Sequence, residues 1–516
     1  MKRIIIRLIS TVAFSITVCA FAVAAPQMHF EVRIDAAGNY LNVELTATGL
    51  EGSQTLLKLP VWAPGYYIIM DYPKHIIDFE ANSGGQPLKW EKVGKSGWLV
   101  THGAGKNIKV TYSVYANAQS VADAKVTAER AFIPGNGVYM YIDNHKEIPA
   151  TVTFHLPSGW KTISTGLDPV HGAKNTYRAK DFDTLYDSPV LLGNQTVIFF
   201  DMEGKKYEMA LETPEGIEET TFVEDLKKMI SASTSLMRGI PYDHYCFLFL
   251  GPGGGGLEHL NSQASFGISF RNRERNSYLS LLSFVTHEFF HLYNVKTIRP
   301  IELGPFDYDK EVFTSGLWIS EGFTCYYEPL LLRRAGIMTA EEALRKHNSA
   351  IKTVENAEGK MHMSLRQSSY DIWLNFFNRS ANGNTRISYY NKGPILGLLT
   401  DIAIRHATGN TKSLDDVMRS LYHDFHIAKG RGFTEEEYWT LCASIARQPL
   451  TEIREYVDTT KEIDYVKYLA CAGIDIDTTP LAEQDGGALV KRNWQMSFRD
   501  EQKCTPLQLA IRKAIF

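Results

Sequence analysis

Apolar and polar residues alternate along much of the chain between about residues 28 and 215. From 108 to 114, Ile, Val, Tyr and Val take every second position, with Lys, Thr and Ser between them. This period of two is typical of a strand with one buried and one exposed face. TVTFHL at 151–156 and TVIFF at 196–200 are similar runs, and EGKK at 203–206 predicts a hairpin turn. The pattern predicts an N-terminal all-β, sandwich-like domain.

Helical signals dominate from about residue 216 onward. Thr339 followed by Glu342, and Thr434 followed by Glu437, have the spacing of capping boxes at helix starts. Gly336 and Gly409 follow basic residues and predict helix ends. Two apolar stretches, 277–295 and 312–335, are long enough to be helices, and we expect the C-terminal part of the chain to be largely helical.

The first 24 residues have the layout of a secretory signal peptide: a basic start, an apolar centre and the small-x-small trio Ala22-Val23-Ala24. A membrane anchor is the alternative, but Arg7 and other polar residues interrupt the apolar run, which is short for a span. We expect cleavage after Ala24 and an exported, soluble protein, either periplasmic or secreted, with no membrane span in the mature chain.

Charge and cysteine content narrow the expected partners. Three basic and no acidic residues lie in 1–24, so cleavage changes the net charge from −4 to −7. This mild acidity argues against nucleic acid as a partner. The cysteines left after cleavage are scattered and odd in number, which predicts stability from a core rather than from disulfides. The oligomeric state stays open.

The stretch 277–295 contains the motif H-E-x-x-H, as His287, Glu288 and His291. Residues four apart share a helix face, so both imidazoles can bind one metal ion, and Glu288 can reach a water on that ion. Catalytic zinc takes three protein ligands and keeps one open position. Glu321, an acid in the largely uncharged stretch 312–335, is the candidate third ligand.

Cys325 lies four residues after Glu321 and could face the metal. We expect instead that its side chain is buried and packs as a small hydrophobic residue. Asn294, Lys296 and Arg299 follow the metal helix and are candidates for supporting contacts.

A glycine run at 251–256 formally satisfies G-x-G-x-x-G, the dinucleotide-binding pattern. Such a loop should lead straight into a helix, whereas LEHLNSQASFGISF follows, with helix breakers and strand-like alternation. The favoured interpretation is that Gly255 and Gly256 let a substrate backbone approach closely. They would also place Glu258 at the end of a cleft.

Several motifs together resemble the glycyl aminopeptidase family of zinc metallopeptidases, a member of the gluzincin group. They are HEFFHLYNVKTIRP at 287–300, LWISEGFTCYY at 317–327, YYNKG at 389–393, GGGGLEHLNS at 253–262, WAPGYYIIMDYPKHI at 62–76 and YVDTTKEIDYVKYLACAGI at 456–474. They occur in the expected order over nearly the whole mature chain.

The resemblance implies a role for each matching residue. His287, His291 and Glu321 would bind one Zn²⁺ per chain, and Glu288 would be the general base. Tyr390 would stabilise the oxyanion, and Glu258 would bind the substrate's free amino group. Relatives usually carry Met-Glu-Asn where this chain has Leu257-Glu258-His259, so the role of His259 stays open.

The resemblance also implies an α+β multidomain fold. Its segments are a signal peptide at 1–24, the β domain at 25–215, a thermolysin-like zinc catalytic domain at 216–335, a helical domain completing the cleft at 336–475 and a short C-terminal appendage at 476–516. Members of the family typically continue into a PDZ module, for which this sequence leaves no room after Phe516.

The expected function is a zinc aminopeptidase that removes small N-terminal residues, Gly or Ala by resemblance, from peptides. Two alternatives stay open. One is a zinc endopeptidase in which Glu258 is structural, and the other is a non-catalytic peptide-binding protein on the same scaffold.

Overall fold

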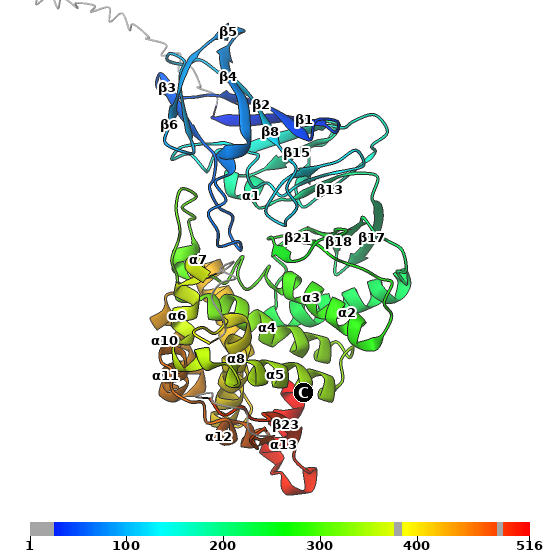
Figure 1. The fold of residues 1–516 in the computed structure, drawn as a ribbon, viewed down its shortest axis with the longest axis vertical. Helices are drawn as coiled ribbons and strands as arrows, with labels where there is room; N and C mark the ends of the chain where they lie inside the picture. The colour runs from blue at the N-terminus through cyan, green and yellow to red at the C-terminus, as the bar shows by residue number, and fades with distance from the viewer. Residues whose placement is uncertain (1–24, 376–383, 482–488) are drawn as a thin grey trace, which may run out of the picture.

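The computed structural model describes residues 25–375, 384–481 and 489–516. The predicted signal peptide, 1–24, lies outside the described residues. None of the described helices combines the length and the apolar content that a bilayer crossing requires. Figure 1 shows a β region at the top, a mixed region in the middle and a helical region at the bottom.

Three sheets pack around one hydrophobic core in the β region. The largest has the strand order β14 (Asp168–Pro169), β15 (Thr176–Ala179), β12 (Ala150–His155), β1 (Gln27–Asp35), β2 (Tyr40–Thr48), β8 (Ile108–Tyr115), β4 (Ile76–Ser83) and β5 (Gln86–Pro87). A second has the order β13 (Thr162–Thr165), β16 (Val190–Gly193), β10 (Ala131–Ile133) and β9 (Lys125–Val126). The third is β11 (Tyr141–Ile142), β3 (Gln54–Lys58), β7 (Gly97–Thr101) and β6 (Lys89–Val93). A 3₁₀ turn, η1 (Tyr72–His75), and a short helix, α1 (Phe182–Tyr186), lie between strands.

The alternation that predicted these strands is confirmed in β8. Its residues Ile108, Val110, Tyr112 and Val114 are buried, whereas the polar residues between them are partly exposed. One face of the strand therefore packs on the core and the other meets solvent.

A five-stranded sheet connects the β region to the helices. Its order is β17 (Thr196–Met202), β18 (Lys205–Leu211), β19 (His244–Phe249), β21 (Ser262–Ser265) and β20 (Gly256–Glu258). Glu203 and Gly204 form the predicted hairpin turn, and both have positive φ, as two-residue hairpins favour. The predicted domain boundary at 215 falls between strands of this one sheet.

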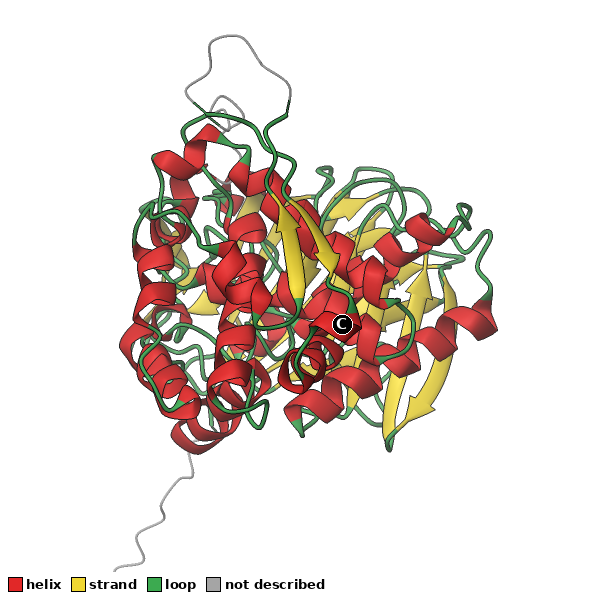
Figure 2. Cartoon of the chain, turned by 90° about the horizontal axis from the view of Figure 1, so that it is seen from below, coloured by secondary structure: helices red, strands yellow, loops and turns green. Residues whose placement is uncertain are grey.

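The remainder is mainly helical, and in Figure 2 the helices fill the left of the view while strands gather to the right. The longest helices are α2 (Glu219–Met237), α3 (Arg275–Phe290), α4 (Leu317–Arg334), α5 (Ala340–Glu355) and α8 (Tyr389–Ala407). Shorter ones are α6 (Leu365–Tyr370), α7 (Ile372–Asn375), α9 (Leu414–Ser420), α10 (Glu435–Ala446), α11 (Thr451–Asp458), α12 (Tyr465–Ala470) and α13 (Pro506–Ile515). Single turns are η2 (Ile301–Leu303), η3 (Glu358–Met361) and η5 (Glu501–Lys503), and η4 (Leu421–Ile427) is a π-helical segment.

Helix ends follow the sequence signals closely. Thr339 and Thr434 each form a complete capping box at the start of α5 and α10. Gly336 and Gly409 have positive φ just beyond the ends of α4 and α8. The fold is therefore α+β, with a β-rich N-terminal region and a helical C-terminal region, as predicted.

The last segment of the chain packs onto the helical core. A hairpin of β22 (Ile474–Asp477) and β23 (Gln495–Phe498) precedes α13. Met496, Ile511 and Ile515 are buried in the same hydrophobic core as α4 and α8, so this segment contributes to that core rather than forming one of its own.

Helices α4 and α8 touch backbone to backbone at a pair of glycines. A Cβ atom on Gly322 would lie 2.5 Å from the Cα of Gly393, and a Cβ on Gly393 would lie 2.5 Å from the Cα of Gly322. Neither position has room for a side chain unless the helices separate. Since Gly322 follows Glu321, this crossing also fixes the candidate third ligand relative to Tyr390 at the start of α8.

We predict that Gly322→Ala lowers the free energy of unfolding by about 1–3 kcal/mol, because the added methyl group overpacks the crossing. Chemical denaturation measures the change. Gly254→Ala is the control, since a Cβ there meets no other atom within 4 Å. Equal stabilities of the two variants would contradict the close packing of α4 on α8.

Candidate metal centre and active site

Three side chains converge where α3 meets α4. The Nε2 atoms of His287 and His291 lie 3.0 Å apart. Oε2 of Glu321 lies 3.5 Å from the first and 3.2 Å from the second. Ligands at about 2.0–2.1 Å from a tetrahedral zinc ion lie about 3.3 Å from one another. The three predicted ligand atoms therefore already form a triangle of the size that one zinc ion needs.

The hydrogen bonding and the charge of Glu321 also favour a bound cation. Oε2 of Glu321 is buried and has no hydrogen-bond partner in the part of the chain that the structure describes. Burial alone would raise the pKa of Glu321, but His291 and His287 lower it below its ordinary value, so the carboxylate is anionic. A buried carboxylate is costly unless a positive charge lies beside it, and a metal ion bound by the same two imidazoles would supply that charge.

His291 lies one residue beyond the end of the metal helix. The sequence predicts a helix over 277–295, but α3 ends at Phe290 and His291 is its C-cap residue. The backbone of His291 still has helical angles, φ −60 and ψ −21, so the two imidazoles keep the same face. Residues 291–297 continue as hydrogen-bonded turns, in which the backbone N–H of Asn294 donates to Phe290 and that of Val295 donates to His291.

Asn294, a candidate for a supporting contact, contacts the metal site twice. Its carbonyl oxygen accepts a hydrogen bond from Nδ1 of His291 at 2.7 Å, which leaves Nε2 free to bind a metal. Its amide donates to the carbonyl oxygens of Ile319 and Ser320 at 2.9 and 3.0 Å. Asn294 thus ties one imidazole to the segment of α4 that carries Glu321.

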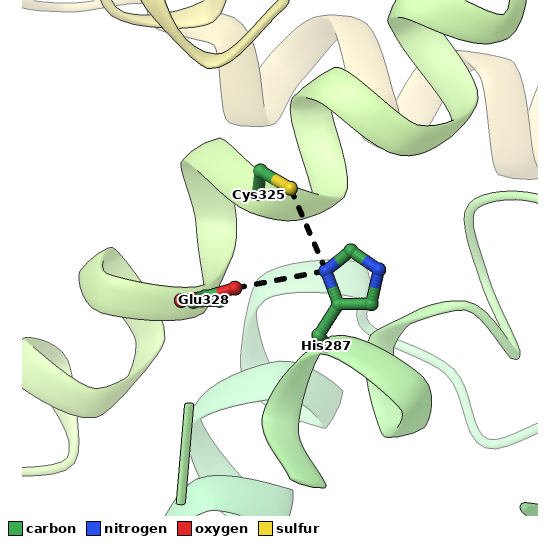
Figure 3. A group of neighbouring side chains, drawn as sticks. All are labelled: His287, Cys325 and Glu328. Carbon is green, nitrogen blue, oxygen red and sulfur yellow. Dashed lines mark hydrogen bonds and ion pairs between the residues drawn. The ribbon is translucent and has the colours of Figure 1, made fainter. Parts of the chain in front are cut away.

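The Nδ1 edge of His287 faces two side chains of α4, as Figure 3 shows. Sγ of Cys325 lies 3.7 Å from Nδ1 and Oε2 of Glu328 lies 3.6 Å from it. The expectation that Cys325 is only a packed hydrophobic residue was incomplete, because it contacts a ligand on the edge away from the metal. Burial raises the pKa of Cys325, which keeps the thiol protonated. Sequence reasoning missed Glu328, although it lies seven residues after Glu321.

The carboxylate of Glu288 lies next to Gly256, the first residue of β20, and lines the same cavity as the three ligands. Glu288 is 5% exposed, and burial raises its pKa to about 7. A Cβ on Gly256 would lie 2.0 Å from Oε1 of Glu288. The glycine therefore makes room for the carboxylate of Glu288, whereas the sequence suggested room for substrate. Gly255 has φ +93 and a Cβ there would meet open space, which leaves its backbone accessible in the cavity.

Glu258 lies on β20, and the glycine run leads into this edge strand rather than into a helix. The nucleotide-loop alternative is therefore wrong. Glu258 is 4% exposed, and its Oε1 has no hydrogen-bond partner among the described residues. Its carboxylate lies within 4.8 Å of ligand atoms of Glu288 and His291. A Cβ on Gly65 would lie 2.7 Å from Oε1, so a loop of the β region covers this end of the site.

His259 anchors the same strand to the β region. Its Nδ1 lies 3.0 Å from Oδ1 of Asp187, which also accepts from Nζ of Lys296 at 2.7 Å. Oδ2 of Asp187 accepts from the backbone N–H of Leu260 at 3.0 Å. Burial would raise the pKa of Asp187, but Lys296 and His259 lower it to about 2. His259 is thus structural, and Lys296 supports this strand rather than the metal ligands.

Tyr390 is the second residue of α8 and is 36% exposed. Its ring centroid lies 6.3 Å from that of His287, and the neighbouring Tyr389 is buried. Burial raises the pKa of the Tyr390 hydroxyl well above its ordinary value, and the charge of Glu321 adds to the effect. The hydroxyl therefore keeps its proton and can donate a hydrogen bond.

One cavity of about 690 Å³ connects these groups. All the residues that the sequence singled out as site residues line it: Gly255, Gly256, Glu258, His287, Glu288, His291, Glu321 and Tyr390. Tyr66, Ser120 and Val121 of the β region line it too, and no sequence motif identified the latter two.

Comparisons with known proteins agree with this architecture. A model of the M61 peptidase N-terminal domain matches residues 29–194, and a model of the M61 glycyl aminopeptidase matches residues 280–396. No curated protein sequence matches the chain.

Several solved structures have a fold similar to that of this chain. An aminopeptidase N family protein from Idiomarina loihiensis is 27% identical, with a TM-score of 0.83 over 90% of this chain and 82% of its own. An M1 zinc metallopeptidase from Deinococcus radiodurans is 15% identical, with a TM-score of 0.52 over 85% of this chain and 94% of its own. Native yeast LTA4 hydrolase is 13% identical, with a TM-score of 0.51 over 86% of this chain and 69% of its own. The last two show a shared fold.

The two family models match successive parts of one chain and together span more than half of it, with the metal triangle inside the second. The chain is a metallopeptidase and belongs to the M61 glycyl aminopeptidase family.

Proposed function

We propose that this chain is a zinc aminopeptidase that removes single small residues from the N-terminus of peptides. One observation carries the proposal. Two glutamates, Glu321 and Glu258, line the same cavity, and each has one buried carboxylate oxygen without a hydrogen-bond partner among the described residues. Each needs a cation. The metal ion supplies one, and the ammonium group of a peptide N-terminus supplies the other.

The position of Glu258 favours an exopeptidase over an endopeptidase. The loop around Gly65 abuts its carboxylate. The aromatic contacts of Trp62 and Tyr67 with Trp373, at 5.1 and 5.6 Å between ring centroids, hold this loop against the helical region. A substrate chain that continued past Glu258 would meet this loop. The preference for small residues rests on the family resemblance.

The chemistry follows from where each group lies. A zinc ion held by His287, His291 and Glu321 would supply a Lewis acid and would make water available as a nucleophile near neutral pH. Glu288, with its pKa near 7, accepts a proton from the attacking water and passes it to the leaving amine. Tyr390 donates a hydrogen bond to the oxyanion, and Glu258 fixes the distance from the free amine to the scissile bond. The complete set of these residues argues against the non-catalytic alternative.

Replacing Glu258 by Gln tests the proposal. We expect kcat/KM for a free alanyl peptide to fall about 10²-fold, because losing one partner of a buried charge pair costs about 2–5 kcal/mol. The wild-type enzyme should cleave the N-acetylated peptide poorly, and the variant should lose nothing further on it. Assays on the matched pair of peptides measure both effects.

Glu341→Gln, an exposed substitution on α5, is the control and should leave both rates unchanged. Equal cleavage of free and acetylated peptides by the wild type would contradict the proposal and favour the endopeptidase.

Tyr390→Phe should lower kcat by about 10²–10³-fold with little change in KM, since the hydrogen bond strengthens in the transition state. Steady-state kinetics test this, with zinc content measured in parallel. Tyr389→Phe is the matched control, because Tyr389 is buried and is not among the residues that line the cavity. A Tyr390→Phe variant with full kcat would exclude the oxyanion role.

A further inference from the structure

The cavity extends beyond the groups that the proposed mechanism uses. Ser280, Ser283 and Phe284 of α3, Glu328 of α4 and Lys346 of α5 also line it. Lys346 is the one Lys or Arg side chain among the described lining residues. Glutamate carboxylates are the other charged groups that line the cavity, so Lys346 adds a positive charge to an otherwise acidic site.

The ring of His287 shows on which side of the metal triangle Lys346 lies. The Nε2 edge faces His291 and Glu321, and Glu258 lies next to His291. The opposite edge, Nδ1, faces Glu328 (Figure 3), whose other oxygen lies 3.8 Å from Nζ of Lys346. Lys346 and Glu258 therefore lie on opposite sides of the metal-binding atoms, in one continuous cavity.

The separation suits a short peptide. Two contacts, of 3.8 and 3.6 Å, link Lys346 through Glu328 to Nδ1 of His287. They put the ammonium at most about 12 Å from the metal-facing nitrogen, and an extended chain covers about 3.5 Å per residue. The ammonium is therefore within reach of the C-terminus of a substrate with two or three residues after the scissile bond.

The local bonding leaves the ammonium available. An ammonium has three donors, and Glu328 lies beyond hydrogen-bond distance, at 3.8 Å. The side chain of Lys346 is 37% exposed. Ser283, one helical turn before His287, also lines the cavity, and its hydroxyl is buried without a hydrogen-bond partner among the described residues.

We propose that Lys346 binds the C-terminal carboxylate of the substrate, so that the preferred substrates are tripeptides and tetrapeptides with two free ends. This rests on the proposed function, in which Glu258 holds the amino end. Water adds across the first peptide bond, the C–N bond breaks, and a free amino acid and a peptide one residue shorter leave. Longer peptides place their carboxylate beyond the reach of Lys346.

The test compares tri-alanine with its C-terminal amide. We expect the wild type to prefer the acid by about tenfold in kcat/KM, the scale of a charge-assisted hydrogen bond at a partly exposed site. In Lys346→Met the acid-to-amide ratio should fall to about one. Because the ratio is taken within one protein, a general loss of activity cancels. Lys352→Met, further along α5 and not among the lining residues, is the control and should keep the wild-type ratio.

A wild-type ratio near one, or an unchanged ratio in Lys346→Met, would overturn the proposal. Calorimetry with the Glu288→Gln variant, which should bind peptides without cleaving them, separates this failure from failure of the proposed function. If the wild type cleaves neither peptide, the aminopeptidase assignment fails. Tighter binding of the acid than of the amide in Glu288→Gln would then still support Lys346, and its absence there would exclude the carboxylate site.

Discussion

The convergence of two imidazoles and one carboxylate at the contact of α3 with α4 is the constraint on which the site depends. Glu321 is 3% exposed, and almost all the residues around it in α4 are buried. Several features hold this charge in place. The imidazoles lower its pKa, Asn294 ties the end of α3 to the backbone on either side of Ser320, and the glycine contact brings α8 against the next residue. A buried anion costs several kcal/mol unless it is paired, so the packing of three helices and the binding of a cation are coupled.

The β region forms part of the site, because its residues line the cavity and contact the strand that carries Glu258. Its loop at Gly65 abuts Glu258, and Asp187 at the end of α1 joins His259 and Lys296. These contacts fix β20, which carries Glu258 and, through Gly256, leaves room for Glu288. A cavity with a carboxylate at its covered end, a metal triangle in the middle and an ammonium at the other end follows from this arrangement. The proposed removal of single residues from short peptides requires such an arrangement.

The sequence predicts the parts of this site that depend on local spacing. His287 and His291 are four residues apart, so their shared face follows from a short-range rule. Glu321 lies on another helix; its apolar surroundings make it a candidate, and the family resemblance assigns it as the third ligand. Capping boxes and glycine helix ends are equally local. Contacts between residues far apart are not predictable in this way: Asp187 and His259 are separated by 72 positions, and Asp187 and Lys296 by 109. The Gly322–Gly393 crossing and the cover over Glu258 depend on tertiary packing of the same kind. Cys325 is an intermediate case, because its spacing from Glu321 places it near the metal but does not show which edge of His287 it meets.

X-ray absorption at the zinc edge of the purified, zinc-loaded enzyme tests the central claim most directly. The account predicts one tightly held zinc per chain with only nitrogen and oxygen ligands at about 2.0–2.2 Å, two of them imidazoles. A sulfur ligand at about 2.3 Å would place the ion between Cys325, Glu328 and the other edge of His287 instead, and would contradict the account.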